Sequence, residues 1–345
     1  MAATGAGQVT LADVALLAGV SLATASRALG EGHGRTVGVE LRARVRAAAL
    51  ELNYSPNGHA QAMRSGSTTV GLIVHDIADP AAASVAAGVM AAAGRAGRIV
   101  TIASSGGDAE REVTLVEMLR RQRVTSVILA GSRFTDPDSD RWLAEEVAGI
   151  RAGGGRVAVI GQRQFPASTV QIDNRGGAGD LARTLWGLGH RTFAVLAGPD
   201  SLLTAEERVE GFREALGELG HDLRPDLVVG SEFTRDGGYA AMSALLDQGV
   251  AETVDCVFAV NDMMAIGAMA ALREHGLAVP RDIAVAGFDD IPILRDVLPA
   301  LTTVRLPLTE IGRWAYELAA EDDGPEGATR VVTGDVVVRA STPPR

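Results

Sequence analysis

The hydrophobic positions of the chain follow two different periods, and the change between them lies near residue 69. Residues 10–52 show apolar residues three and four apart, the spacing of short amphipathic helices. From residue 69 onward, short runs of β-branched residues alternate with alanine-rich stretches. The pattern therefore predicts a small helical domain followed by a larger α/β region.

The first region predicts three helices. Thr10 and Asp13 have the spacing of a capping box, and Gly19 ends the helix that they begin. Ser21 caps a second helix over residues 22–29, so a short turn that contains glycine joins the two, as in a helix-turn-helix. A third helix is predicted over residues 39–52. The apolar positions expected on the inner faces of the first and third helices are Val14, Leu17, Ala18, Leu41, Val45, Ala49 and Leu52.

The second region predicts two doubly wound lobes. Apolar strands separated by helices imply parallel sheets covered on both faces, with a ligand cleft beyond the carboxyl ends of the strands. A break near residues 165–170 separates the lobes, and the elements after residue 300 complete either lobe. The strands are expected at residues 70–76, 99–103, 126–129, 157–160, 192–197, 227–229, 256–260, 283–286, 301–305 and 330–338, with a helix at 307–320.

Composition changes the picture mainly through charge. The net charge of −11 argues against nucleic-acid binding by the whole chain, but residues 1–66 hold six arginines and four acidic residues, a charge of +2 that leaves −13 elsewhere. Hydrophobic residues at 47% and charged residues at 22% are ordinary globular values. Cys256 is the single cysteine, and residues 1–10 lack a secretory signal pattern, so we expect a cytoplasmic protein with no membrane partner.

Catalytic and metal-binding patterns are weak. The six histidines and one cysteine show no metal-ligand spacing, and no G-x-S-x-G nucleophile elbow occurs. The glycine-rich residues 175–179 lack the lysine and hydroxyl of a phosphate-binding loop, and we interpret them as a tight strand-to-helix turn. We therefore expect no cofactor, no metal and no enzyme activity.

Ordered motifs along almost the whole chain resemble the LacI/GalR family of bacterial transcription regulators. The first is the helix-turn-helix string of residues 9–29. The later ones are Asn53-Tyr-Ser-Pro-Asn57, Arg64-Ser-Gly66, Gly71-Leu-Ile-Val74, Asp173-Asn-Arg-Gly-Gly177, Leu188-Gly-His-Arg191, Ala197-Gly-Pro199, Arg208-Val-Glu-Gly-Phe212, Asn261-Asp262, Gly287-Phe-Asp-Asp290 and Leu301-Thr-Thr-Val304.

The resemblance implies a homodimer whose protomers share one domain organisation. The DNA-binding headpiece covers residues 1–56, the hinge 57–66, and the effector-binding and dimerisation core 67–345. Within the core we assign 67–164 and 301–323 to an N-lobe, and 165–292 and 326–345 to a C-lobe. The architecture expected is that of periplasmic sugar-binding proteins.

The resemblance also implies which residues contact DNA. Leu22 and Ala23 should meet base edges, and Arg27 should read guanine, because arginine can donate two hydrogen bonds to that base. Polar residues near the helix starts are expected to contact phosphates, which fixes position without reading sequence. The full set of expected DNA contacts is Thr10, Leu11, Ser21, Leu22, Ala23, Thr24, Ser26, Arg27, Tyr54, Asn57, His59, Ala60 and Met63.

Three departures from the family affect this DNA-binding region. Met63 stands where the family has a leucine that wedges into the minor groove, and methionine can serve because it is flexible and apolar. Gly58 disfavours a hinge helix by about 1 kcal/mol, so we expect hinge folding to be coupled to DNA binding. Gly38 replaces a serine cap of the third helix, which removes roughly 1 kcal/mol.

The family's effector site maps onto positions at the expected strand ends. Arg208 is expected to open the helix before Gly211, Asp289 follows a strand, and Phe233 matches a ring that stacks on the effector. Ala81 and Ala82 replace two aromatic residues on the opposite wall. The full expected effector set is Asp79, Ser132, Gln162, Thr204, Arg208, Phe233, Asn261 and Asp289.

The sequence therefore predicts a sequence-specific transcription regulator, a homodimeric repressor whose operator affinity responds to a small molecule. We expect a sugar or sugar derivative, with a nucleoside or another metabolite as the alternative. A solute-binding or sensor protein without site-specific DNA reading is the alternative function.

Overall fold

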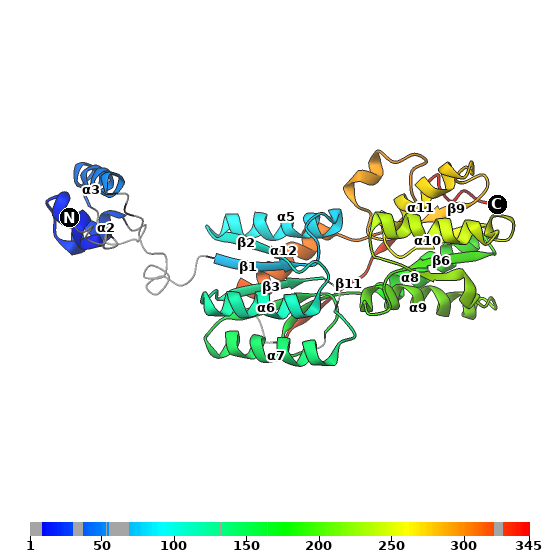
Figure 1. Cartoon of the computed structure of the whole chain (residues 1–345), viewed down its shortest axis with the longest axis horizontal. Coiled ribbons are helices and arrows are strands. Elements are labelled where there is room, and N and C mark those ends of the chain that lie inside the picture. Colours follow the sequence, from blue (N-terminus) through cyan, green and yellow to red (C-terminus); the bar gives the residue numbers. More distant parts are fainter. Residues whose placement is uncertain are drawn as a thin grey trace, which may run out of the picture. The chain divides into compact units, whose positions relative to one another are not determined.

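The computed structural model describes residues 9–29, 37–52, 54, 69–131, 133–163, 165–320 and 327–345. The chain forms two compact units, Met1–Thr68 and Thr69–Arg345 (Figure 1). Among the described residues, no single helix has the length and apolar character needed to cross a membrane; only the bent pair Leu11–Leu17 and Leu22–Leu29, taken together, passes that test.

The first unit contains three helices, α1 (Leu11–Leu17), α2 (Leu22–Leu29) and α3 (Val39–Glu51). The first two meet at a bend of 102°, which confirms the predicted helix-turn-helix. Gly19 lies in the turn with a φ of +61°, a left-handed conformation that glycine adopts without steric cost.

Small residues fill the interior of this unit. The buried residues are Val14, Ala15, Ala18, Ala25, Ala28, Val45, Ala48 and Ala49. The expectation that Leu17 and Leu41 lie inside is wrong, because both side chains are exposed and Leu52 is only partly buried. The helices cross through alanines, so these larger side chains are displaced to the rim.

The second unit begins with a six-stranded parallel sheet in the order β11-β5-β4-β3-β1-β2. Helices α5 and α12 cover one face, and α6 and α7 cover the other (Figure 1). The elements are β1 (Thr69–Val74), α5 (Pro80–Arg95), β2 (Ile99–Ser104), α6 (Ala109–Arg121), β3 (Ser126–Ala130), α7 (Pro137–Ala152), β4 (Arg156–Ile160), β5 (Ser168–Ile172), α12 (Leu308–Ala320) and β11 (Thr329–Val332). We call this sheet, together with its four helices, the first lobe.

The second lobe contains a four-stranded parallel sheet in the order β7-β6-β8-β9. Helices α8 and α9 lie on one face, and α10 and α11 on the other (Figure 1). An antiparallel pair, β10 and β12, joins it through bridges such as Ala286 to Thr302. The elements are α8 (Asn174–Gly187), β6 (Phe193–Ala197), α9 (Leu203–Glu218), β7 (Val228–Gly230), α10 (Arg235–Asp247), β8 (Cys256–Ala259), α11 (Asp262–Glu274), β9 (Ala284–Ala286), β10 (Thr303–Arg305) and β12 (Asp335–Val337), with 3-10 turns at Pro225–Leu227, Val250–Glu252 and Pro292–Arg295.

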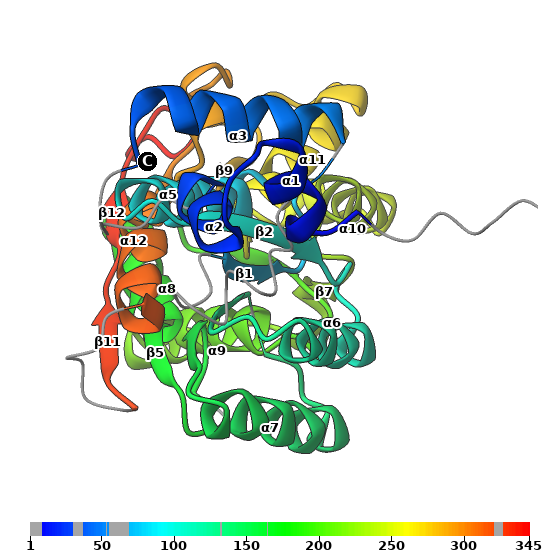
Figure 2. The ribbon, with the colours of Figure 1, turned by 90° about the vertical axis from the view of Figure 1, so that its left-hand side faces the viewer.

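The lobe boundaries expected from the sequence need three corrections. The break near residues 165–170 is the missed strand β5, whose polar residues weaken the apolar run. The expected last strand is two strands, and β11 pairs with β5 in the first sheet, as Figure 2 shows, while β12 stays in the second lobe. Strand β10 likewise belongs with the second lobe. The chain thus passes between the lobes after β5, after β10 and after β11. Hydrophobic periodicity predicts where strands lie but not which sheet each strand joins.

Candidate functional site

The start of α1 is held by the predicted capping box. The Asp13 amide donates to Thr10 Oγ1 at 3.4 Å, and the Thr10 amide donates to Asp13 Oδ2 at 2.7 Å. The Thr10 side-chain hydrogen bond lowers the pKa of Asp13, so this exposed carboxylate stays charged at the positive end of the helix.

The start of α2 is built in a similar way and exposes apolar atoms. The Thr24 amide donates to Ser21 Oγ at 3.2 Å, which confirms Ser21 as the cap. Leu22 is 54% exposed and Ala23 is also exposed, so neither contributes to the interior. Exposed apolar side chains at a helix start suit contact with thymine methyl groups.

Arg27 lies on the same exposed side of α2, one turn from Ala23. Its Nε donates to the Ala23 carbonyl oxygen at 3.0 Å, which holds the side chain against its own helix. Thr24 and Ser26 are half-buried. Leu11 and Tyr54 pack against the interior of the unit, so their roles in this structure are structural as well.

Some expected DNA and effector residues lie outside the described residues. These are Asn57, His59, Ala60, Met63 and Ser132, and their roles stay predictions. The missing cap of α3 is confirmed, since Gly38 makes no side-chain capping bond.

In the second unit, Arg208 forms the centre of a buried polar cluster. The sequence predicts Arg208 at the start of its helix, but it lies inside α9. The residue is 3% exposed. Nε donates to Asn174 Oδ1 at 2.9 Å, Nη1 to the Val260 carbonyl oxygen at 2.7 Å, and Nη2 to Asp289 Oδ1 at 2.9 Å. These acceptors compensate the burial of the charge.

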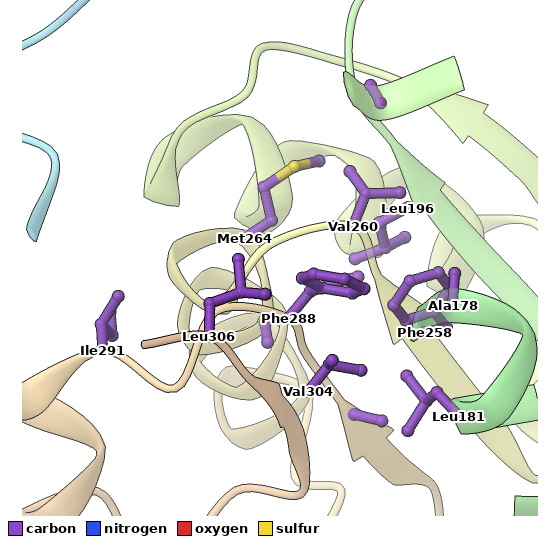
Figure 3. Close-up of a cluster of buried hydrophobic side chains, with 14 of the residues drawn as sticks. Ala178, Leu181, Leu196, Phe258, Val260, Met264, Phe288, Ile291, Val304 and Leu306 are labelled. Carbon is purple, nitrogen blue, oxygen red and sulfur yellow. The ribbon is translucent and has the colours of Figure 1, made fainter. Parts of the chain in front are cut away.

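An aromatic ring supports the guanidinium of Arg208. Its central carbon lies 3.8 Å from the centroid of the Phe288 ring. Figure 3 shows this ring among Val260, Val304 and Leu306, in the hydrophobic interior of the second lobe. The ring therefore fixes the guanidinium plane, a favourable cation–π arrangement.

Asp289, which accepts a hydrogen bond from Arg208, is buried and has an uncommon backbone conformation. The residue is 7% exposed, and its φ of 115° is rare for a residue other than glycine. Burial raises the pKa of its carboxyl to about 6, although Arg208 acts in the opposite direction, and Asp79 adds to the rise. Strained backbone and perturbed acids are common at functional sites.

Asp79 brings the first lobe to the same cluster. Its Oδ1 accepts from the Ala81 amide at 3.0 Å and so caps α5. Burial raises the pKa of this carboxyl, while backbone hydrogen bonds and the charge of Arg208 lower it. Two aspartates from different lobes therefore interact electrostatically with one arginine, whereas the neighbouring Ala81 and Ala82 present no ring.

Phe233 and Asn261 lie after strands of the second sheet, as predicted. A Cβ at Gly198 would come within 2.8 Å of Phe233 Cδ2, so this glycine makes room for the ring. Asn261 caps α11, with Oδ1 accepting from the Met264 amide at 2.7 Å and Nδ2 donating to the Phe233 carbonyl oxygen at 3.2 Å. Its contact with an effector stays a prediction, because both ends of this amide already have partners.

The remaining members of the expected effector set that are described, Gln162 and Thr204, are in contact. Gln162 Nε2 donates to Thr204 Oγ1 at 3.1 Å and to Glu207 Oε2 at 2.8 Å. Glu207 also accepts from Asn174 Nδ2 at 2.8 Å. The sequence analysis predicted neither Asn174 nor Glu207 as a site residue. Asn174 lies within the motif of residues 173–177, but nothing in the pattern distinguishes Glu207 from a solvated helix residue.

The glycine-rich residues 175–179 are not a turn, which corrects the sequence interpretation. They form the first part of α8, capped by Asp173. A Cβ at Gly211 of α9 would lie 2.1 Å from the Arg175 carbonyl oxygen. The glycines therefore allow α8 and α9 to pack closely, and this brings Asn174 to Arg208. Among the described residues, no group of three or more potential ligands is arranged to hold a metal ion.

Comparisons with known proteins agree with both units. Residues 10–57 match the model described as bacterial regulatory proteins, lacI family, and residues 182–342 match a periplasmic binding protein-like domain. The HTH-type transcriptional regulator GalR of Escherichia coli (strain K12) is 33% identical over 314 residues, 90% of this chain and 88% of GalR.

Two solved structures extend the likeness to the fold. The transcriptional regulator CelR–cellobiose complex has a TM-score of 0.69 and 33% identity, over 96% of this chain and 99% of that one. The Lac repressor dimer bound to operator and the anti-inducer ONPF has a TM-score of 0.78 and 26% identity, over 98% and 100%. The predicted fold class is therefore confirmed, and the relatives are regulators, not enzymes. The chain belongs to the lacI family of bacterial regulatory proteins and is a DNA-binding transcriptional regulator.

Proposed function

We propose that this regulator is a homodimeric repressor whose operator affinity changes when a small molecule binds between the two lobes of its core. The carrying observation is the cluster in which Arg208 and Asp289 of the second lobe interact with Asp79 of the first. A ligand that contacts both aspartates bridges the two lobes, so its affinity depends on how the lobes are arranged. The Lac repressor structure supports the dimer, since that relative binds its operator in this form.

DNA reading is assigned to the exposed start of α2. Leu22 and Ala23 meet thymine methyl groups, and Arg27 donates to guanine after its bond to Ala23 is released. Thr10, Ser21, Thr24 and Ser26 contact phosphates. Met63 is the proposed minor-groove wedge. A bacterial operator as target is the reason to place the protein in the cytoplasm, on chromosomal DNA.

The effector is a sugar or sugar derivative. Carboxylates and a guanidinium in one cluster offer acceptors and donors to neighbouring hydroxyl groups, and Phe233 offers one ring face. The solved CelR relative is a cellobiose complex, which supports this class. A nucleoside is the second candidate, because the ring of Phe233 suits a base equally well.

Linkage joins the two sites. An effector that favours one arrangement of the lobes changes operator affinity by a certain factor, and operator changes effector affinity by the same factor. The corresponding coupling free energy is typically about 1–3 kcal/mol. Relief of repression and corepression both obey this relation.

The test is a mobility shift of the full chain on its own upstream DNA, over a salt series and with a panel of sugars and nucleosides. We expect one near-palindromic site to shift and one compound to change its affinity. Binding that is equal on all DNA fragments would refute site-specific reading. If no compound changes the affinity of a specific site, the effector assignment is wrong while the DNA-binding assignment stands.

A further inference from the structure

The two lobes are joined by backbone hydrogen bonds between the segments that follow β3 and β6. The Leu203 amide donates to the Arg133 carbonyl oxygen at 3.0 Å, and the Thr135 amide donates to the Ser201 carbonyl oxygen at 3.0 Å. Phe134 forms an antiparallel bridge with Leu202 between them. A short two-stranded contact thus links loops of different sheets.

A buried ion pair anchors this contact in the first lobe. Arg133 is 1% exposed and Glu112 of α6 is 2% exposed. Nη1 and Nη2 of Arg133 donate to the two carboxylate oxygens of Glu112, each at 2.7 Å. This two-bond geometry fixes the guanidinium, so the backbone of Arg133 is held in place where it meets Leu203.

Gln162 adds a side-chain link beside the backbone contact. Its Oε1 accepts from the Arg133 amide at 3.0 Å, and its Nε2 donates to Thr204 and Glu207 of the second lobe at 3.1 and 2.8 Å. The amide therefore joins the anchored segment to α9.

Glu207 connects this link to the Arg208 cluster. The same oxygen, Oε2, accepts from Gln162 and from Asn174, both at 2.8 Å. Asn174 in turn accepts from Arg208 Nε at 2.9 Å. A continuous series of hydrogen bonds thus runs from Glu112 in the first lobe to Asp289 in the second.

We propose that residues 133–135, 201–204, Gln162 and Glu207 form an interlobe latch, in which Glu207 is the positioning residue that joins the latch to the Arg208 cluster. The latch holds the lobes together through contacts that the chain makes with its own atoms. Because Gln162 and Thr204 also belong to the expected effector set, an effector must fit around their bond or replace it. The relation of the latch to effector binding rests on the proposed function, whereas the latch itself does not.

Amide hydrogen exchange of the full chain tests the latch directly, because the Thr135 and Leu203 amides are its donors. We expect Glu207→Ala to speed exchange at both amides at least tenfold, while amides within β3 and β6 keep their rates. Glu207→Gln should retain slow exchange, since its amide oxygen can accept both bonds. Glu206→Ala is the matched control, an exposed neighbour on the same helix.

Unchanged exchange at Thr135 and Leu203 in Glu207→Ala would overturn the proposal. If β3 and β6 also exchange faster in that variant, Thr204→Val decides, because it removes one Gln162 acceptor and keeps the side-chain shape. Faster exchange confined to Thr135 and Leu203 supports the latch in that variant, and unchanged exchange overturns it. Neither operator nor effector is used, so failure of the latch leaves the proposed function intact, and the mobility shift tests that function separately.

Discussion

Arg208 donates to Asp289 across 2.9 Å, and the accepting carboxylate lies on a backbone with a φ of 115°. Asparagine and aspartate tolerate positive φ better than most residues, but a value this large is uncommon. The surrounding bonds hold it, since the Asp289 amide donates to the Val304 carbonyl oxygen at 2.8 Å. The pair is thus fixed at the end of β9, where a ligand can exchange bonds with it.

Asp289→Asn tests the effector role with little change in shape. We expect operator binding within about twofold of the parent chain and loss of the response to any compound that changes parent binding, because the amide cannot offer Arg208 or a ligand the same charge. Mobility shifts with and without that compound measure both. Asp290→Asn is the control, since Asp290 pairs with Arg305 and Arg339 instead. An unchanged response in Asp289→Asn would remove Asp289 from the effector site.

The raised pKa of Asp289 predicts a pH dependence of stability. Its folded pKa of about 6 exceeds the unfolded value of about 3.9, so the folded state binds this proton more tightly. The stability of the fold should therefore fall as pH rises from about 4 to about 6, by on the order of 2 kcal/mol for this group.

Urea unfolding at several pH values measures this effect. Asp79 and Asp262 also have raised pKa values and change stability in the same direction, so the quantity to follow is the difference between the parent and Asp289→Asn. That difference should change across the window. A constant difference from pH 4 to 7 would contradict the assignment.

Gly211→Ala should destabilise the core by about 1–3 kcal/mol, because the new Cβ would lie 2.1 Å from the Arg175 carbonyl oxygen. Gly217→Ala, on the same helix with no atom within 4 Å of its Cβ, should stabilise it by up to about 1 kcal/mol. Denaturant unfolding of the two variants measures opposite signs. Equal effects would contradict the close contact between α8 and α9 at Gly211.

Arg27→Ala should relax base preference at one operator position and cost about 1–3 kcal/mol of specific binding. Arg42→Ala provides the comparison, an exposed arginine on α3 whose loss should leave base preference unchanged. Binding to a library of operator variants at fixed salt gives both profiles. The reading role of Arg27 fails if its variant shows the base preferences of the parent.

Local patterns predicted much of the fold. The capping box at Thr10, the glycine turn at Gly19 and the apolar strands of both lobes depend on residues close in sequence, and all are present. The motif at residues 208–212 singled out Arg208, but it was expected to open its helix and lies inside α9 instead. Predictions failed where the partner lies far along the chain, as for β5 and β11, which are more than 150 residues apart and complete one sheet together.

The sequence by itself determined the helix-turn-helix, the alternation of strands and helices, and the family. These follow from spacing, capping and propensity, which act over a few residues. Only the tertiary structure decided that Glu207 joins Gln162 to Asn174, that Arg133 is buried against Glu112, and that Asp79 and Asp289 interact with one arginine. Burial and long-range hydrogen bonding set these relations, because a charged residue is stable inside a protein only where the fold brings its partners.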